Sequence, residues 1–159
     1  MAGQRFKWHG LSNVDRKGRL SVPAAYRQAI EARGGGRDIM MSRHPSAPCI
    51  VCYDRGTEDE VDQDLKAQKR IELERGDKTS FITRNRGIYM SSAEVSWDPS
   101  GRVILPDYLR DRAGITDAAL FVAFGDGFEI WDPKTALEQK QDEGLRDLAE
   151  YHLRKGPAK

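Results

Sequence analysis

The chain contains 159 residues, of which 38% are hydrophobic and 32% are charged, and its formal net charge is +1 at pH 7. This length suits one domain, or two small units that share a core. No run of 18 apolar residues is present that could span a membrane, and the N-terminal sequence MAGQRFKWHG lacks the apolar centre of a secretory signal. We therefore expect a cytoplasmic protein without a membrane partner.

Charge is unevenly distributed along the chain, although the total is close to zero. Basic residues dominate from Arg5 to Arg43, whereas the segment from Glu58 to Asp64 is acidic. Because local patches matter more than the total, a net charge of +1 neither indicates nor excludes a nucleic-acid partner.

The first element in chain order is a short turn that occurs twice. Residues 14–23 read VDRKGRLSVP and residues 97–106 read WDPSGRVILP, so both contain the pattern Asp-x-x-Gly-Arg-apolar-x-apolar-Pro, 83 positions apart. The pattern predicts a tight hairpin, in which the aspartate accepts hydrogen bonds from the turn backbone and the glycine adopts a positive φ. The residues that shape the two turns are Asp15, Gly18, Asp98 and Gly101.

A helix and two strands are expected after the first turn. Pro23 suits the first position of a helix, so the run AAYRQAIEARGGG after it is predicted to form a short helix that ends at Gly34. Strand-like runs follow at 37–43 and 49–53. A charged helix is expected over 58–75. Within 79–90, another short helix could be anchored by Phe81, Ile82, Ile88 and Tyr89.

The second half repeats this order. Pro106 precedes a helix that ends at Gly114, the sequence GDG indicates a hairpin between strands at 119–124 and 128–131, and a last helix is expected over 134–153. A unit this small cannot bury its own sheet face, but two packed copies can. The chain is therefore predicted to be an α+β tandem duplication. Its expected parts are a first repeat at 5–56, connecting helices at 57–88, a second repeat at 89–133 and a C-terminal helix at 134–153.

Arg19 and Arg102 are the candidate functional residues of the repeat. Each precedes alternating apolar residues that are expected in the core, so both arginines should point away from it. Two interpretations remain open: each arginine pairs with its own aspartate and fixes the turn, or each presents an exposed guanidinium to phosphate or guanine. The first turn also carries Arg16 and Lys17, so it should bind phosphate more strongly than the second.

No arrangement of residues in the sequence is typical of an enzyme. The three histidines are scattered, and the GGGR run at 34–37 lacks the Gly-Lys-Ser/Thr ending of a phosphate-binding loop. Cys49 and Cys52 lie in a strand-like run, where residues three apart point to opposite faces, so their thiols should not meet. With His44 alone nearby, we expect neither a metal site nor a redox site, and no cofactor.

The motifs of the chain resemble those of the MraZ family. The matching segments are DRKGRLSVPAAYR at 15–27, DPSGRVILPDYLR at 98–110 and FEIWDP at 128–133, and they follow in order over nearly the whole chain. The resemblance implies two AbrB-like repeats that form a swapped-hairpin β-barrel as a pseudo-dimer, with helices outside it. It also implies a ring-shaped homo-oligomer.

The resemblance further implies a function. Members of this family bind G-rich direct repeats of double-stranded DNA in their own promoter, upstream of the division and cell-wall gene cluster, usually as repressors associated with the nucleoid. Carried across residue by residue, Arg19 and Arg102 would contact DNA, assisted by Lys17 and Arg16. Lys7 stands at a position that is commonly basic, although the neighbouring Trp8-His9 pair departs from the usual small residue.

Two other functions are compatible with the sequence. An AbrB-like antitoxin would bind DNA as a dimer and neutralise a toxin with a disordered tail, but only a short tail follows Leu153. A non-DNA assembly protein would use its turns for contacts between copies, and the outward-facing apolar residue Ile104 indicates that some of this surface lies in an interface. A salt-dependent gel shift on the promoter of the protein's own operon would separate the three functions.

Overall fold

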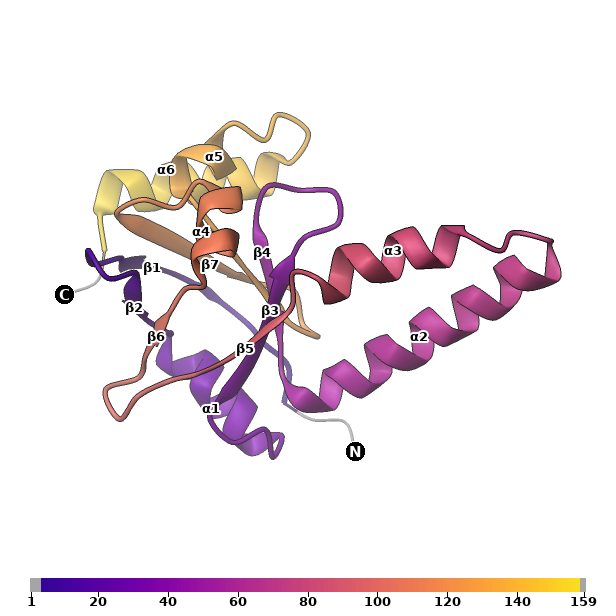
Figure 1. Cartoon of the computed structure of the whole chain (residues 1–159). Coiled ribbons are helices and arrows are strands. Elements are labelled where there is room, and N and C mark those ends of the chain that lie inside the picture. Colours follow the sequence, from indigo (N-terminus) through magenta and orange to yellow (C-terminus); the bar gives the residue numbers. More distant parts are fainter. Residues whose placement is uncertain (1–3, 158–159) are drawn as a thin grey trace.

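The computed structural model describes residues 4–157, which form a mixed α+β fold (Figure 1). The strands are β1 (His9–Asn13), β2 (Arg19–Ser21), β3 (Asp38–Arg43), β4 (Ile50–Tyr53), β5 (Ala93–Ser96), β6 (Arg102–Ile104), β7 (Ala118–Ala123) and β8 (Phe128–Trp131). The helices are α1 (Ala24–Ala32), α2 (Arg55–Glu74), α3 (Ser80–Tyr89), α4 (Asp107–Ala113), α5 (Pro133–Leu137) and α6 (Glu143–Lys155). Over this range, no helix combines the length and the apolar content that crossing a membrane requires.

The main sheet has six antiparallel strands in the order β1-β7-β8-β4-β3-β5. Strand β1 from the first half pairs with β7 from the second, and β5 from the second half pairs with β3 from the first. The strands β1, β3 and β4 of the first half are equivalent to β5, β7 and β8 of the second half. When these equivalent strands are exchanged, the same order is obtained, read from the opposite edge of the sheet. The sheet therefore has an approximate internal two-fold axis. The expected closed barrel is wrong, because β2 and β6 pair with each other in a separate sheet and leave β1 and β5 at open edges.

The separate two-stranded sheet, here called the ribbon (β2 and β6), joins the two halves. Its residue pairs are Arg19 with Ile104, Leu20 with Val103, and Ser21 with Arg102. Leu20 and Val103 are equivalent positions of the repeat, so the internal two-fold axis passes between them. The predicted hairpin is therefore corrected: the turn itself is tight, but the strands on either side of it, β1 and β2, pair with strands of the other half.

Helix α4 begins and ends at the residues that the sequence indicated, and helix α1 begins there but ends two residues earlier than predicted. They start one position after Pro23 and Pro106, and Gly114, with φ of 66°, terminates α4. Helix α1 ends two residues before Gly34, which has φ of 80°. A left-handed residue of this kind lets the chain leave the helix without strain.

The main core lies between the sheet and helices α1 and α4. The Tyr26 ring of α1 packs against the rings of Phe121 and Phe128, with centroids 6.0 and 4.7 Å away. The alternating apolar residues after both turns are also buried, as predicted; they are Leu20, Val22, Val103 and Leu105. Burial of each such side chain stabilises the fold by about 1.5–3 kcal/mol. The inner side of the ribbon is thus anchored in the core, so the side chains of its outer side must point away from the core.

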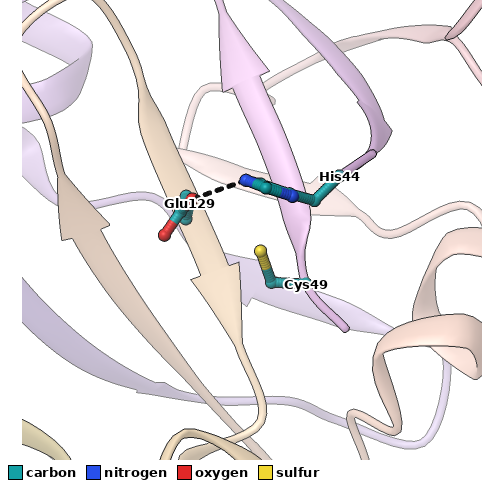
Figure 2. A group of neighbouring side chains, drawn as sticks. All are labelled: His44, Cys49 and Glu129. Carbon is teal, nitrogen blue, oxygen red and sulfur yellow. Dashed lines mark ion pairs between the residues drawn. The ribbon is translucent and has the colours of Figure 1, made fainter. Parts of the chain in front are cut away.

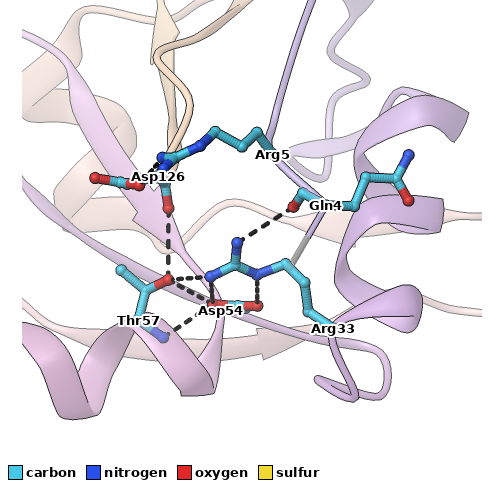
Figure 3. Close-up of polar contacts among 6 residues, drawn as sticks. All are labelled: Gln4, Arg5, Arg33, Asp54, Thr57 and Asp126. Carbon is cyan, nitrogen blue, oxygen red and sulfur yellow. Dashed lines mark hydrogen bonds and ion pairs between the residues drawn. The ribbon is translucent and has the colours of Figure 1, made fainter. Parts of the chain in front are cut away.

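A buried ion pair ties α1 to the start of α2. Arg33 Nε donates to Asp54 Oδ2 at 2.5 Å, and Arg33 Nη2 donates to Thr57 Oγ1 at 2.7 Å (Figure 3). Asp54 Oδ1 accepts from the backbone N–H of Thr57 at 3.0 Å and so caps α2. Arg33 Nη1 also donates to the carbonyl of Gln4 at 3.2 Å, which fixes the N-terminal segment to the same network.

Helices α2 and α3 form an antiparallel pair that extends away from the sheet, here called the helical arm (residues 55–89; Figure 1). The Glu72 carboxylate accepts two hydrogen bonds from Arg84, at 2.9 and 2.7 Å. Lys69 Nζ lies 4.4 Å from the ring centroid of Phe81. Leu65 is buried where α2 faces α3, whereas α3 itself has no buried residue. The arm is therefore held together along one side of each helix only.

The single C-terminal helix predicted over 134–153 is wrong, because α5 and α6 take its place. Asp132 and Asp142 cap the two helices, each accepting a backbone hydrogen bond at 3.0 Å. In one straight helix, Leu137 and Leu145 would lie about 12 Å apart along the axis. The break allows both to pack in one apolar cluster with Trp131.

Candidate nucleic-acid interface

The two repeated turns have the same backbone geometry. Gly18 and Gly101 both have φ of 81°, a left-handed conformation that residues with a side chain rarely adopt. The N–H of Gly18 donates to the Asp15 carbonyl at 3.0 Å, and the N–H of Gly101 donates to the Asp98 carbonyl at 2.8 Å. The prediction of a tight turn with a left-handed glycine is confirmed at both positions.

One carboxylate oxygen holds the backbone of each turn. Asp15 Oδ1 accepts from the N–H groups of Lys17 and Arg19, both at 2.9 Å. Asp98 Oδ1 accepts the two equivalent bonds at 2.9 and 3.0 Å. In both turns the backbone hydrogen bond from the arginine is the largest influence, and it lowers the pKa of the aspartate carboxyl. The aspartate thus holds each turn through backbone hydrogen bonds alone, without any contribution from the arginine side chain.

The arginine side chains use the other carboxylate oxygen. Arg19 Nε donates to Asp15 Oδ2 at 2.7 Å, and Arg102 Nε donates to Asp98 Oδ2 at 3.3 Å. Each arginine is therefore paired with the aspartate of its own turn, which was one of the two interpretations of the sequence, but the pairing uses only the Nε atom of the arginine. Within residues 4–157 the Nη atoms of both arginines lack a hydrogen-bond partner, and the side chains are 35% and 40% exposed. Each aspartate thus orients a guanidinium whose outer edge remains open to a ligand.

Both arginines lie on the outer side of the ribbon. Leu20 and Val103 are buried, so their neighbours in each strand face away from the core. The outward residues are Arg19, Ser21, Arg102 and Ile104. Because the strands are antiparallel, the two arginines occupy a diagonal, with Cα atoms roughly 7–8 Å apart. A two-stranded ribbon of this kind fits the major groove of DNA.

Two further arginines, which the sequence analysis missed, lie against the turns. A Cβ atom at Gly101 would lie 2.7 Å from Arg27 Cζ, and a Cβ atom at Gly18 would lie 3.2 Å from Arg110 Nη1. Each arginine belongs to the helix that follows one turn but packs on the other turn. The sequence repeat could have pointed to these two residues, since Arg27 and Arg110 occupy equivalent positions at the ends of the two matched motifs.

The first turn carries more charge of both signs than the second. Arg16 and Lys17 are exposed on it, where the second turn has proline and serine. A hollow beside the first turn is also lined by four carboxylates, those of Asp15, Asp107, Asp111 and Asp117, and by two arginines, Arg16 and Arg110. Because acids outnumber bases in this hollow, an anionic ligand is favoured to approach over the outer side of the ribbon.

Lys7 lies apart from the first turn, and its side chain is exposed. It precedes β1 whereas the turn follows β1, so about 17 Å of extended strand separates them. The neighbouring Trp8 is 73% exposed and has φ of 81°. Its carbonyl accepts from Tyr26 Oη at 2.7 Å and from the N–H of Ala123 at 3.2 Å, which hold this strained conformation. A glycine in place of Trp8 would adopt it without strain.

A second polar cluster joins the loop after β3 to strand β8. His44, Cys49 and Glu129 bring an imidazole nitrogen, a thiol sulfur and a carboxylate oxygen within 4.8 Å of one another (Figure 2). Sequence reasoning considered His44 and Cys49 but missed Glu129, which reaches them because β8 pairs with β4. These three groups are types of ligand that Zn²⁺ accepts, and their hydrogen bonds decide whether they suit a metal ion.

The hydrogen bonds of this cluster fit a metal ion poorly. His44 Nδ1 accepts from the backbone N–H groups of Ser46 and Ala47, both at 3.0 Å, so the proton of the neutral ring lies on Nε2, which faces Glu129 Oε2 at 3.4 Å. A metal-bound histidine normally donates from its second nitrogen, which here faces two donors instead. Burial, followed by the charge of Glu129, raises the pKa of the Cys49 thiol. The cluster therefore fixes the loop to the sheet.

The two cysteines lie on opposite sides of the sheet. Both are buried and both are free thiols. Cys52 packs in the main core, whereas Cys49 packs in the other apolar cluster beside Trp131. The prediction that the two thiols point to opposite faces is confirmed, and the Cys-x-x-Cys pair is not arranged as a redox site.

Comparisons with known proteins give one family. Residues 88–153 match the family model described as "MraZ protein, putative antitoxin-like". A relative from Ruegeria pomeroyi, named Transcriptional regulator MraZ, is 32% identical over 157 residues, which cover 92% of this chain and 90% of the relative. A relative of the same name from Rhodospirillum rubrum is 37% identical over 127 residues, which cover 80% and 78% of the two chains. A third, from Parvibaculum lavamentivorans, is 34% identical over 148 residues, which cover 90% and 88%.

These similarities extend well beyond the second half that the family model matches. An alignment that covers nine-tenths of the chain includes most of both repeats. The relatives are named as transcriptional regulators and not as enzymes, in agreement with the expected non-enzymatic role. The chain therefore belongs to the MraZ family of transcriptional regulators.

Proposed function

We propose that this protein is a sequence-specific DNA-binding regulator, and that the outer side of the ribbon is its contact surface. The observation that carries this proposal is the pair of guanidinium groups at Arg19 and Arg102, each oriented through Nε and open at its Nη atoms. An arginine presented in this way donates two hydrogen bonds to O6 and N7 of guanine. A pair of them would favour a G-rich site.

The basic residues around the turns would supply phosphate contacts. Lys17 and Arg16 are exposed at the tip of the first turn, and Lys7 is exposed on the segment before β1. Arg27 and Arg110 pack on the turns and would add positive charge at both ends of the ribbon. Contacts to phosphate fix the position of a protein on DNA, whereas contacts to bases select the sequence.

The internal two-fold axis supports a division into two AbrB-like repeats. Exchange of strands between the halves is what a swapped-hairpin pseudo-dimer requires, and β1 and β5 are exchanged in this way. We therefore retain the repeats at 5–56 and 89–133, separated by connecting helices at 57–88 and followed by the C-terminal segment 134–153.

In the cell, the protein would act on its own promoter. Its relatives are named as transcriptional regulators. We infer that it binds G-rich direct repeats there and represses the division and cell-wall gene cluster, as a cytoplasmic protein associated with the nucleoid. Two turns per chain offer few base contacts, so a ring of copies would strengthen binding by placing many turns along spaced repeats.

An antitoxin role is the second candidate, and the description of the matched family model favours it. An antitoxin would bind a toxin through a segment that is disordered until the partner is present. The C-terminal residues up to Lys155 are instead helical in α6, where Leu145 and Ala149 are buried. The geometry therefore supports the regulator more directly.

A DNA-binding titration tests the proposed function. Fluorescence anisotropy would compare a promoter fragment that contains the direct repeats with a scrambled fragment of equal length and composition, between about 50 and 200 mM salt. We expect tighter binding to the repeats, and affinity that falls as salt rises. Equal affinity for the two fragments would contradict sequence-specific binding, and no binding to either would favour an assembly role.

A further inference from the structure

A polar hollow lies between the loop that joins β3 to β4 and the C-terminal end of α4. Its volume is about 390 Å³, within the range of about 300–1,000 Å³ that is typical of small-molecule sites. Two arginines, a histidine, a serine and two prolines line it: Arg43, Arg112, His44, Ser46, Pro45 and Pro48. Over the part of the chain that the structure describes, no carboxylate lines it. We call it the arginine hollow.

Tyr108 of α4 brings the two guanidinium groups of the arginine hollow together. Arg43 Nη1 donates to Tyr108 Oη at 3.4 Å, and Arg112 stands four residues after Tyr108, on the same face of α4. Arg43 also lies against α3, because a Cβ atom at Gly87 would lie 3.7 Å from Arg43 Nη2. Arg43 is therefore held between two helices, with its positive charge beside that of Arg112.

Within residues 4–157, neither arginine of the hollow forms an ion pair, and the side-chain hydrogen bond of Arg43 goes to a neutral hydroxyl. Asp107 and Asp111, which belong to the same helix as Arg112, line the hollow beside the first turn instead. Glu129 lies behind His44, where its two oxygens face His44 Nε2 and Trp131 Nε1. The two guanidinium groups therefore lack a contacting carboxylate among the described residues.

The ends of helices α3 and α4 account for only part of this arrangement. Gly87 lies in the last turn of α3 and Arg112 in the last turn of α4. A helix C-terminus carries roughly half a negative charge, so two such ends offset about half of the two guanidinium charges. An oxyanion that accepts hydrogen bonds from both arginines would offset the remainder.

The loop that lines the arginine hollow is held in place without a ligand. His44 Nδ1 accepts from the N–H groups of Ser46 and Ala47, and the N–H of His44 donates to the Cys49 carbonyl at 3.1 Å. The imidazole is in turn fixed to β8 by Glu129 (Figure 2). Ser46 is exposed, and among the described residues its hydroxyl has no hydrogen-bond partner. The hollow is thus formed in advance, which lowers the entropy lost on binding.

We propose that the arginine hollow binds the phosphoryl group of a small phosphorylated molecule. A guanidinium can donate two parallel hydrogen bonds to a phosphate, so Arg43 and Arg112 together suit a phosphate dianion. The hydroxyl of Ser46 would donate to the same group, and Pro45 and Pro48 would contact a small organic part of the ligand. The site does not depend on the proposed function, because Arg112 lies at the end of α4 that is farther from the ribbon (Figure 1).

Calorimetric titration of the DNA-free protein at constant ionic strength tests this site, with inorganic phosphate, ribose 5-phosphate and ribose as probes. At about pH 7.5 a phosphate monoester is mostly a dianion, because its second pKa is about 6. We expect ribose 5-phosphate to bind more tightly than inorganic phosphate, and ribose not to bind. Arg112→Gln should weaken both phosphate probes by about tenfold or more, since charge-assisted hydrogen bonds are lost. The matched control is Arg70→Gln, which removes an exposed arginine of the helical arm and should bind both probes normally.

A second variant separates a lost phosphate contact from disturbed packing. Arg43 packs between α3 and α4, so its truncation could loosen both helices, whereas Arg112 is exposed and Arg112→Gln should keep the melting temperature of the unmodified protein. Arg43→Lys retains the positive charge but not the two parallel hydrogen bonds. It should therefore weaken ribose 5-phosphate less than Arg112→Gln does, with a melting temperature close to that of the unmodified protein.

Several results would overturn the phosphate site. These are equal binding of the phosphate probes to Arg112→Gln and to the unmodified protein, no binding of either probe, or ribose 5-phosphate that binds no more tightly than ribose or inorganic phosphate. If Arg112→Gln instead weakened promoter DNA and left the phosphate probes unaffected, the arginine would contact the DNA backbone and the proposal would be wrong.

Discussion

Asp15 and Asp98 show how an arginine can form an ion pair with an aspartate and still have its Nη atoms available to a ligand. In each case Oδ1 holds the turn backbone and Oδ2 accepts from the arginine Nε. The ion pair therefore sets the direction of the guanidinium without using its outer edge. An exposed arginine that is oriented in advance loses less conformational entropy on binding than a free one.

The side chain of Lys17 is exposed at the tip of the first turn, where it can contact a phosphate. Lys17→Ala should weaken binding to all DNA sequences alike, and should reduce the slope of log affinity against log salt by about 1, because one phosphate contact is lost. Anisotropy titrations at several salt concentrations measure both effects, with the exposed Lys140→Ala as control. A loss confined to the promoter sequence would instead indicate a base contact.

A pair of histidines makes the stability of the fold depend on pH. His9 Nδ1 and His152 Nε2 lie 2.7 Å apart, between β1 and α6. Burial lowers the pKa of both imidazoles, and for His152 the charge of His9 lowers it further. The unfolded chain, with pKa values of about 6.5, then binds protons more readily than the folded chain, so stability is lost as the pH falls below about 6.5.

Urea unfolding at about pH 7.5 and pH 5.5 measures this dependence. We expect a lower midpoint at the acidic pH, and a smaller difference in the His9→Asn/His152→Asn variant. Stability that stays constant or rises on acidification would contradict this account of the histidine pair.

At the scale of elements, the ion pair between Arg33 and Asp54 holds α1 against the start of α2. Burial raises the pKa of the Asp54 carboxyl, but the hydrogen bonds from Arg33 and Thr57 and the charge of Arg33 outweigh it, so the net pKa is lowered. Arg33→Met would leave a buried carboxylate without its partner. We expect a loss of about 3–5 kcal/mol in the free energy of unfolding at neutral pH, measured with denaturant.

The double variant Arg33→Met/Asp54→Asn is the control for that measurement. It removes the unpaired charge as well as the ion pair, so it should be more stable than Arg33→Met alone. If the two variants were equally destabilised, the lost packing of the arginine would be responsible rather than the buried charge.

Local patterns predicted most of the elements but not how they pair. Alternating apolar residues and glycine or proline boundaries located β3, β4, β7, β8, α1 and α4 to within a residue or two. The exchange of β1 and β5 between the halves depends on contacts between distant segments, which a local pattern does not contain. The break between α5 and α6 likewise results from packing of Leu137 and Leu145 against one cluster.

The candidate interface was predictable in part. The repeat located both turns and the outward direction of Arg19 and Arg102, because each precedes buried apolar residues in a strand. It did not show that Arg27 packs on the second turn, since that contact crosses between the halves. The sequence also left open whether the arginines pair with aspartate or stay available, and the geometry of the carboxylates reconciles the two interpretations.

At the scale of the whole molecule, the exchanged strands place two turns on one ribbon. Each half supplies one turn and one strand of it, so the spacing of the arginines depends on both halves being folded together. A chain with one ribbon makes few base contacts, and its net charge of +1 gives little general attraction to DNA. Under the proposed function, strong binding to DNA would therefore require several copies acting together.

Affinity should depend on the number and spacing of repeats in the DNA. Once one turn pair is bound, linked copies would meet further repeats at high effective concentration, which raises affinity by about 10²–10⁴-fold without new contacts. Titration of fragments with one, two and all repeats at equal salt measures this. If one isolated repeat bound as tightly as the full array, assembly would not contribute to recognition.

The most direct test of the DNA-contact assignment is to measure thermal melting and promoter binding on the same Arg19→Ala and Arg102→Ala proteins. Because the aspartates hold the turns through Oδ1, we expect melting temperatures close to that of the unmodified protein. Each substitution should lose about 1–3 kcal/mol of discrimination between promoter and scrambled DNA, with the larger loss of affinity for Arg19→Ala, which lies beside Arg16 and Lys17. A large drop in melting temperature, with promoter affinity retained by the folded molecules, would contradict the assignment.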